Sequence, residues 1–361
     1  MKKKILVADD SALMRRIVCD IINSDDRFEV ADMATNGLEV VELLSKKSYD
    51  AVILDVVMPQ MDGLSVLKEL NKRKISAKVI MNSTLTKEGA NVTMQALEEG
   101  ALEFVHKPNG ILDVRGENYR QTFLSVLEGV CFQVGRAKSG TSAAVRRTEV
   151  SAARTPIVNK PSTVKGKKIL AIASSTGGPK ALHEVIPKLP ANLNAPVLLV
   201  QHMPAGFTAS LAERLNAISA LTVKEAEEGD ILRNGCVYIA KGGSHMKIVR
   251  KNRDYQITLT NEPTREGVRP CANYMYESLA DSDFEEICCV VMTGMGADGT
   301  EGIINLQKTK RVHVIAQSEE TCAVYGMPRS VVNKGLANEV LPLGELAQAA
   351  TKNVGGKIVW M

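Results

Sequence analysis

Long apolar runs are missing from this chain of 361 residues. No stretch approaches the roughly 20 apolar residues that a membrane-spanning helix needs. The lysines of the N-terminus precede only four apolar residues, Ile5–Ala8, so we expect a strand there and not a secretion signal. Apolar residues still make up 45% of the sequence, which is enough to bury the cores of two domains.

Paired cysteines are missing too. The seven cysteines form no C-x-x-C pair, and most of them lie in apolar runs. Scattered cysteines in odd number, without an export signal, favour reduced thiols and a cytoplasmic location.

A net positive charge is missing outside one segment. The net charge is +4, but residues 136–168 hold nine Lys or Arg and one acid, so the remainder is acidic. No C-terminal unit of helix-turn-helix size follows, which disfavours a DNA-binding protein. Residues 136–166 are rich in Ser, Thr, Ala, Arg, Pro and Gly, and we predict a flexible linker. It would separate a domain at 1–125 from a domain at 167–355.

Five apolar strands alternate with five helical stretches before this linker, beginning with "KILVAD" and ending with "YRQTFLSVLEGV". That alternation predicts a (βα)5 domain with a parallel sheet between helices. After the linker it resumes with "KILAIAS", "APVLLVQH", "EICCVVMTGM" and "RVHVIAQ". Residues 236–262 instead show short alternating strands with Gly-Gly and Asn-Arg-Asp turns. The second domain is therefore predicted as a doubly wound parallel α/β sheet with an antiparallel hairpin insertion.

Polar side chains follow the strands of the first domain, and ligands of doubly wound sheets bind at such strand ends. Carboxylates gathered there would repel one another without a cation, and Mg²⁺ suits oxygen ligands of this kind. A lysine and a hydroxyl could hold a phosphoryl group, and one carboxylate could accept it. The residues at these ends are Asp9, Asp10, Asp55, Ser83, Thr84 and Lys107.

These residues, with "VVMPQMDG" after Asp55 and Pro108 after Lys107, resemble a response-regulator receiver domain over about 125 residues. The resemblance implies that Asp55 is the phosphoacceptor and that Lys107 is the conserved lysine. It implies Mg²⁺ ligands at Asp9, Asp10, Asp55 and the Val56 carbonyl. It further implies a switch hydroxyl at Ser83, or at the adjacent Thr84, and a switch aromatic at Phe104.

The stretch "SSTGG" (174–178) breaks the first strand of the second domain. Three hypotheses explain it: a packing turn, a phosphate loop, or a serine presented as a nucleophile. The phosphate loop is the weaker hypothesis, because G-x-x-x-x-G-K-[ST] is absent. If the turn is only structural, the chain is a receiver fused to a binding module and not an enzyme.

A nucleophilic serine needs a base. His202 is the best candidate of the five histidines because it ends a strand, although His245 stays open. Asp298 follows a third strand and a glycine-rich turn whose N–H groups could bind an oxyanion. The chain order Ser, His, Asp differs from that of α/β-hydrolases, and G-x-S-x-G is absent.

The motifs "SSTGGP", "QHMPAGF", "TGMGADG", "KEAEEGD" and "YIAKGGSHM" together resemble the chemotaxis protein-glutamate methylesterases of the CheB family. The resemblance implies that Ser175 is the nucleophile, His202 the base, Asp298 its orienting acid and the Met295 N–H an oxyanion donor. Ser174 is chemically identical to its neighbour. Asn273 replaces an acid of the family, and we expect it to alter substrate contacts.

The family resemblance also implies a function. The substrate would be glutamate γ-methyl esters, with glutamines as a second class, on the cytoplasmic helices of chemoreceptors. A chemotaxis histidine kinase would phosphorylate Asp55 with Mg²⁺, whereas the esterase reaction needs no cofactor. The unphosphorylated receiver would cover the crevice around Ser175, and no nucleic acid or membrane insertion is expected.

Overall fold

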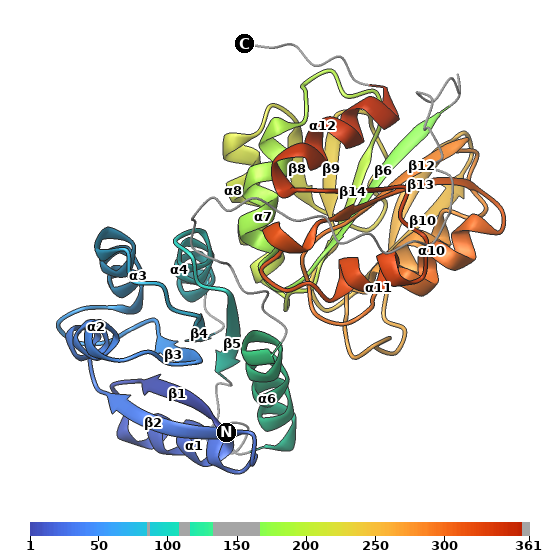
Figure 1. Ribbon diagram of the computed structural model, residues 1–361. Coiled ribbons are helices and arrows are strands. Elements are labelled where there is room, and N and C mark those ends of the chain that lie inside the picture. The colour runs from blue at the N-terminus through green and yellow to red at the C-terminus, as the bar shows by residue number, and fades with distance from the viewer. Residues whose placement is uncertain (85–86, 108–115, 133–166, 356–361) are drawn as a thin grey trace, which may run out of the picture.

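The computed structural model describes residues 1–84, 87–107, 116–132 and 167–355, and it forms two α/β units, each built on a parallel sheet (Figure 1). The predicted linker, 136–166, lies outside these residues. Within them, no helix is long and apolar enough to cross a membrane.

The first unit is a five-stranded parallel sheet between two layers of helices. The strands are β1 (Lys3–Ala8), β2 (Phe28–Ala34), β3 (Ala51–Asp55), β4 (Val79–Thr84) and β5 (Glu103–Lys107). The helices are α1 (Ala12–Asn23), α2 (Gly37–Lys46), α3 (Gly63–Arg73), α4 (Lys87–Glu98) and α6 (Glu117–Phe132). The strand order is β2-β1-β3-β4-β5, and the central strand β3 is buried on both faces, as a parallel strand between helices must be. Helices α1 and α6 pack on one face and α2, α3 and α4 on the other.

The second unit is built on seven parallel strands. They are β6 (Lys168–Ser174), β7 (Val197–Gln201), β8 (Thr222–Glu225), β9 (Cys236–Ile239), β12 (Glu286–Val291), β13 (Arg311–Gln317) and β14 (Glu339–Leu341). Their order in the sheet is β14-β13-β12-β6-β7-β9-β8. The chain reverses direction across the sheet between β6 and β12, so polar residues meet at that switch point.

Helices lie on both faces of this second sheet. The α-helices are α7 (Gly178–Val185), α8 (Phe207–Ile218), α9 (Ala272–Ser278), α10 (Thr300–Gln307), α11 (Met327–Asn333) and α12 (Leu343–Val354). The remaining elements are the hairpin strands β10 (His245–Lys251) and β11 (Asp254–Thr260) and the short 3-10 turns η1 (Ile186–Lys188) and η2 (Glu319–Thr321). Helices α7, α8 and α12 cover one face, and α9, α10, α11 and the hairpin lie over the other.

One part of the predicted hairpin insertion is wrong. Residues 236–239 form β9, which pairs in parallel with β7 and β8 in the main sheet. The Gly242-Gly243 pair is no hairpin turn. It packs against the loop after His202, where a side chain on Gly242 would collide with the Pro204 carbonyl oxygen. Only β10 and β11 form the antiparallel hairpin, turning at Asn252 with φ 58°.

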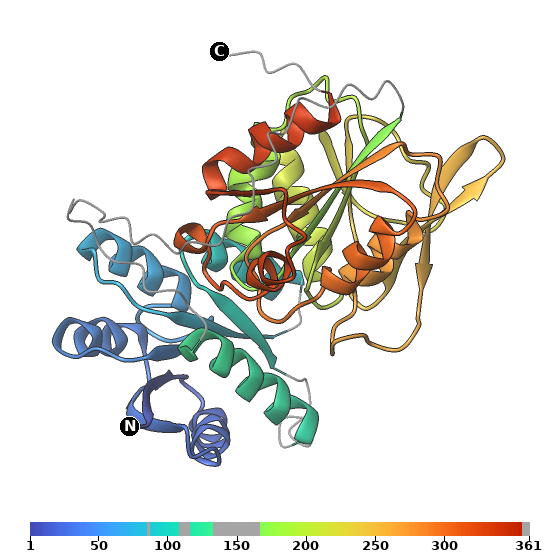
Figure 2. The same ribbon diagram turned by 45° about the vertical axis from the view of Figure 1, so that its right-hand side comes forward.

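The two units pack against each other through α4 of the first and α7 and α8 of the second (Figures 1 and 2). Their apolar residues join in one continuous cluster. Phe104 of β5 stacks on Phe207 of α8 at a centroid distance of 4.4 Å.

Candidate active site

Small residues are needed in the "SSTGG" turn because two other chain segments approach it closely. Gly177 has φ 74°, a conformation that costs side-chain-bearing residues energy. A Cβ on Gly178 would lie 2.0 Å from Gln201 Oε1, so a larger residue would displace the Gln201 side chain. The Ser175 N–H donates to the Thr293 carbonyl at 3.0 Å and ties the turn to the segment after β12.

The two adjacent serines differ in their surroundings. Ser174 is completely buried, and its hydroxyl donates to Gln201 Oε1 at 2.7 Å. Ser175 is partly exposed at the end of the strand, and Gln201 Nε2 donates to its carbonyl at 3.0 Å. Ser174 therefore has a structural partner, whereas Ser175 is accessible.

His202 and Asp298 form a close pair beside this turn. The His202 N–H donates to the Ser174 carbonyl at 3.1 Å, which fixes the histidine next to the serines. His202 Nε2 lies 2.7 Å from Asp298 Oδ2, so the other ring nitrogen, Nδ1, is the one left for a hydroxyl. The three predicted strand ends thus meet at one place.

The Asp298 side chain is buried, with only 2% of it exposed, and several hydrogen-bond donors surround its carboxylate. Burial raises the pKa of this carboxyl, but the His202 hydrogen bond and charge, with the Cys271 thiol, outweigh burial and lower the pKa below its usual value. Besides His202, the donors are Cys271 Sγ at 3.0 Å and the backbone N–H groups of Ala272 at 2.6 Å, Asn273 at 3.0 Å and Gly299 at 2.8 Å.

Asn273 lies in the interior, so its side chain presents no surface for a direct substrate contact. Its side chain is completely buried, and Oδ1 accepts from the Gly299 and Gly302 N–H groups at 3.1 and 2.6 Å. Its amide donates to Glu266 at 2.9 Å. An asparagine serves here because it accepts and donates at once, which an ionised acid cannot do.

The glycine-rich turn after β12 lies directly against Ser175. A Cβ on Gly294 would come within 2.7 Å of the Ser175 Cβ, so glycine is required for this approach. Met295 follows at a partly exposed position. Its backbone N–H therefore belongs to the segment that flanks the serine.

The other histidines have structural partners. His245 is fully buried, with Nε2 3.3 Å from the Pro263 carbonyl, and its ring packs on Tyr274, so it is no base for Ser175. His313 pairs with Glu339 at 2.7 Å, and His106 Nδ1 lies 3.4 Å from the Ser83 carbonyl.

The predicted acidic cluster forms in the first unit. Oxygen atoms of Asp9, Asp10 and Asp55 lie within 4.8 Å of one another. Lys107 Nζ lies 2.8 Å from Asp9 Oδ2 and 2.7 Å from Asp55 Oδ2. Burial raises the pKa of Asp55 to about 6, although the Lys107 ammonium opposes the rise. Three hard oxygen donors fit a magnesium ion, and the ammonium fits a phosphoryl group beside it.

The remaining predicted receiver residues surround this cluster. The Val56 carbonyl accepts from the Gly63 N–H at 3.0 Å and keeps a second lone pair for a metal. Ser83 is buried, and the Thr93 hydroxyl of α4 donates to its Oγ at 2.7 Å. The side chain of Thr84 lies outside the described residues.

Sequence reasoning did not place the contacts between the two units. Glu98 of α4 binds Arg214 of α8 through two oxygens, with Arg214 Nε at 2.6 Å, and its Oε1 lies 2.7 Å from His183 Nε2 of α7. A Cβ on Gly129 of α6 would lie 2.5 Å from the Met295 sulfur, so this helix touches the glycine-rich turn.

The residue before β5, Leu102, contacts the turn that carries Ser175. The Gly177 N–H donates to the Leu102 carbonyl at 3.2 Å. Glu103, the next residue, is partly exposed, and its Oε1 accepts from the Phe104 N–H at 3.1 Å. Nothing in the sequence around Leu102 predicts a contact with the other domain.

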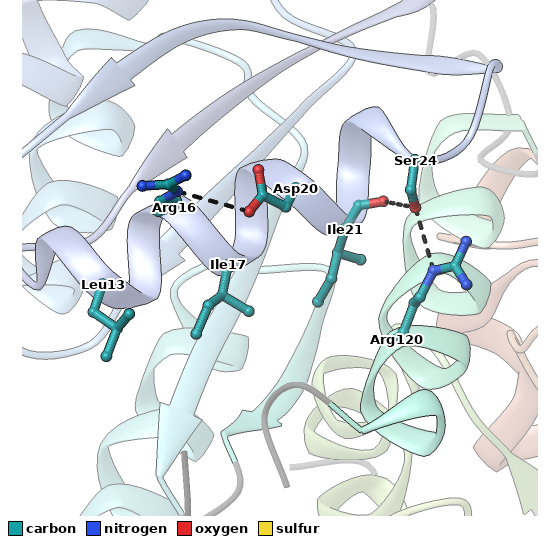
Figure 3. A pocket seen from close by; sticks show the side chains of 7 residues that line it. All are labelled: Leu13, Arg16, Ile17, Asp20, Ile21, Ser24 and Arg120. Carbon is teal, nitrogen blue, oxygen red and sulfur yellow. Dashed lines mark hydrogen bonds and ion pairs between the residues drawn. The ribbon is translucent and has the colours of Figure 1, made fainter. Parts of the chain in front are cut away.

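A separate pocket lies between α1 and α6, where Leu13, Ile17 and Ile21 project from one face of α1 (Figure 3). Arg120 of α6 closes one end and donates to Ser24 at 3.2 Å. None of the acidic-cluster residues or Lys107 lines it.

Two sites are thus present: an acidic cluster with a lysine at the end of one parallel sheet, and a serine, histidine and aspartate at the switch point of another. They are the arrangement expected of a receiver unit joined to a hydrolase. Family models agree: "Response regulator receiver domain" matches residues 5–115 and "CheB methylesterase" matches residues 170–350. The chain belongs to the CheB methylesterase family, with a receiver domain at its N-terminus.

Relatives extend this similarity over the whole length. The protein-glutamate methylesterase/protein-glutamine glutaminase of Bacillus licheniformis is 41% identical and covers 96% of this chain and 97% of its own. Its namesake in Pyrococcus abyssi is 40% identical, covering 98% and 94%. The crystal structure of the Thermotoga maritima CheB methylesterase catalytic domain is 42% identical, covering 52% of this chain and 99% of its own, with a TM-score of 0.50.

Proposed function

We propose that the chain hydrolyses glutamate γ-methyl esters on chemoreceptors, as a phosphorylation-activated enzyme of chemotactic adaptation. The proposal rests on the His202–Asp298 pair at 2.7 Å, fixed beside Ser175. The relatives' names add glutamine deamidation, which uses the same acyl chemistry. A receiver fused to a mere binding module would need neither a buried, ordered His–Asp pair nor an accessible serine.

Ser175 attacks the ester carbonyl carbon while His202 takes the hydroxyl proton. Asp298 fixes the ring through Nε2 and stabilises the imidazolium that forms. The Met295 N–H donates to the oxyanion. His202 then protonates the leaving methoxide oxygen to give methanol, or the leaving nitrogen of a glutamine to give ammonia. A water deprotonated by the same ring attacks the acyl carbon, and Ser175 leaves to release the glutamate. No cofactor is needed in this half of the chain.

The receiver half takes a phosphoryl group on Asp55 from a chemotaxis histidine kinase. Asp9, Asp10, Asp55 and the Val56 carbonyl would hold Mg²⁺, which shields the charge that gathers during transfer. Lys107, already bonded to two of the carboxylates, would turn to the phosphoryl oxygens. The Ser83 hydroxyl would also turn to the phosphoryl group and would lose its hydrogen bond with Thr93 of α4.

We infer that the unphosphorylated receiver restrains the esterase by covering it. The Leu102 carbonyl accepts from Gly177 of the Ser175 turn, Gly129 lies against Met295, and Phe104 stacks on Phe207. A receptor helix cannot reach Ser175 past these groups. Phosphorylation would shift the equilibrium to an open arrangement through Ser83, Phe104 and Lys107.

The proposal also includes the limits of the domains and the cellular location. The receiver would span 1–125, the flexible linker 136–166 and the catalytic domain 167–355. The linker would let the receiver move away without dissociating. Since kinase and receptor helices of this pathway are cytoplasmic, we place the enzyme in the cytoplasm, with no nucleic-acid partner and no membrane insertion.

The decisive experiment measures methanol release from a methylated receptor fragment, with and without a small-molecule phosphodonor and Mg²⁺. The wild type should be active and stimulated, Ser175→Ala inactive though folded, and Asp55→Ala active but unstimulated. Deleting residues 1–150 should leave an active enzyme. A folded wild type that binds the receptor fragment without releasing methanol would replace the proposal with the binding-module alternative.

A further inference from the structure

One buried side chain connects the main chains of the proposed nucleophile and the proposed base. Gln201 is the last residue of β7 and is 2% exposed. Its amide nitrogen, Nε2, donates to the Ser175 carbonyl at 3.0 Å and to the His202 carbonyl at 3.2 Å. The two hydrogens of one planar amide group therefore hold these two carbonyls at a set distance from each other.

The pairing of the two strands ends one residue before the nucleophile. Strands β6 and β7 pair in parallel as far as Ser174 and Gln201. The His202 N–H then donates to the Ser174 carbonyl at 3.1 Å, whereas the Ser175 N–H donates to the Thr293 carbonyl in a different segment. The Gln201 amide thus extends the connection between β6 and β7 to the residue that carries the reacting hydroxyl.

The surroundings of the amide determine which of its ends faces the two carbonyls. At the opposite end, Gln201 Oε1 accepts from the Ser174 hydroxyl at 2.7 Å. A flipped amide would place its oxygen against two carbonyl oxygens, which donate nothing to it. An ionised glutamate would meet the same conflict. Glutamine is therefore suited to this place because it donates twice at one end and accepts at the other.

The start of α7 leaves the amide little room to move. A Cβ on Gly178 would lie 2.0 Å from Gln201 Oε1 and 3.0 Å from the Ser174 Cβ. The Gly178 N–H also donates to the Ser175 carbonyl at 2.6 Å, so two donors hold this carbonyl. The missing side chain of Gly178 thus provides the space that the glutamine amide occupies.

We propose that Gln201 is a positioning residue for the esterase reaction: its amide sets the distance between Ser175 and His202 at which the hydroxyl proton passes to the ring. The inference rests on the proposed function. Gln201 acts through the main chains of the residues that it holds and not on the ester itself. A misplacement of reacting groups by about 1 Å can lower a rate about a hundredfold, so a small shift of either main chain is sufficient.

Gln201→Met tests the proposal, because methionine has a similar unbranched shape and no hydrogen-bond donor. With saturating phosphodonor and Mg²⁺, its kcat for methanol release from a methylated receptor fragment should fall about ten- to a hundredfold. KM should not change, because the surface that meets the receptor is untouched. A glutamine needed only for stability would change the midpoint of urea unfolding and leave the kcat of the folded protein unchanged.

Gly178→Ala displaces the same amide while keeping the glutamine. The nearest atom in the way of the new methyl group is the end of the flexible Gln201 side chain, so the amide should move and the fold should persist. Alanine also favours a helix more than glycine does. We expect kcat to fall about tenfold with KM unchanged. This variant decides the question if Gln201→Met does not fold.

Ser174→Ala is the matched control. It removes the hydrogen bond at the other end of the amide and leaves both carbonyl contacts in place. It should therefore lower the stability of the protein but keep the kcat of the wild type.

These variants distinguish the positioning role from the proposed function. A lower kcat in Gln201→Met and Gly178→Ala, with Ser174→Ala at the wild-type rate, supports the positioning role. A wild-type kcat in either of the first two variants, when folded, overturns it and leaves the proposed function intact. An equal loss of kcat in Ser174→Ala also overturns it, because that variant keeps the carbonyl contacts. A wild type that releases no methanol removes the proposed function, and the inference with it.

Discussion

The ion pairs of Glu98 offer the most direct test of how strongly the receiver is held against the esterase domain. Glu98 pairs with Arg214 and His183 across the domain boundary, and the Glu98 and Arg214 side chains are each 27% exposed. A bidentate pair of this kind exceeds an exposed salt bridge but falls short of a buried one. We assign it about 1.5 kcal/mol of the closing free energy.

Glu98→Gln keeps the size of the side chain and removes its charge. Losing about 1.5 kcal/mol corresponds to a roughly tenfold shift of the closed–open equilibrium. Basal methanol release should therefore rise up to about tenfold, whereas the rate with phosphodonor and Mg²⁺ should not change. The basal rate of the wild type should also rise with salt, because screening weakens the pair, and the variant should lose much of that dependence.

Glu99→Gln is the matched control. Glu99 is the next residue, but its contact is with Asn71 inside the receiver. Its basal rate should equal that of the wild type. Equal basal rates for both variants, with Glu98→Gln folded and phosphorylated normally, would refute the view that this pair holds the receiver shut.

Three further predictions concern the catalytic core. Ser174→Ala should keep ester hydrolysis but lose about 1–3 kcal/mol of stability in urea denaturation, because the buried Gln201 oxygen loses its donor. Asp298 has a lowered pKa, so its stabilising contribution is full above its unfolded value near pH 4 and is lost at lower pH; the Tm advantage of wild type over Asp298→Asn should shrink there. Burial raises the pKa of Cys271 to about 12, so it remains a thiol donor; Cys271→Ala should lower kcat several-fold with KM unchanged, and Cys271→Ser should restore it.

The strand-end sites could be predicted because parallel strands gather their carboxyl ends. Asp9, Asp55 and Lys107 end three strands of one sheet, so their proximity followed from topology alone. The same logic brought His202 and Asp298 together. The alternation of apolar and helical stretches was sufficient to predict the order of most strands and helices along the chain.

Other features had no local signal. The strands β8 and β14 have four and three residues, too few for a clear periodicity, and β9 reads equally well as a hairpin strand. The buried position of Asn273 had no signal because its partners, Glu266, Gly299 and Gly302, lie 7 to 29 residues away in the sequence. The interdomain role of His183 depends on how two units dock, which spacing within one unit cannot specify.

One short strand has a consequence for engineering this enzyme. β5 begins directly after Leu102, whose carbonyl binds the Ser175 turn, and ends at Lys107, which pairs with Asp55. Five steps of about 3.3 Å therefore separate the esterase contact from the lysine of the phosphorylation site. A receiver transplanted from another regulator would bring its own lysine but not the residues that lie on the catalytic turn. Such a chimaera should accept phosphate normally yet leave the esterase permanently active unless residues 102–104 are carried across with it.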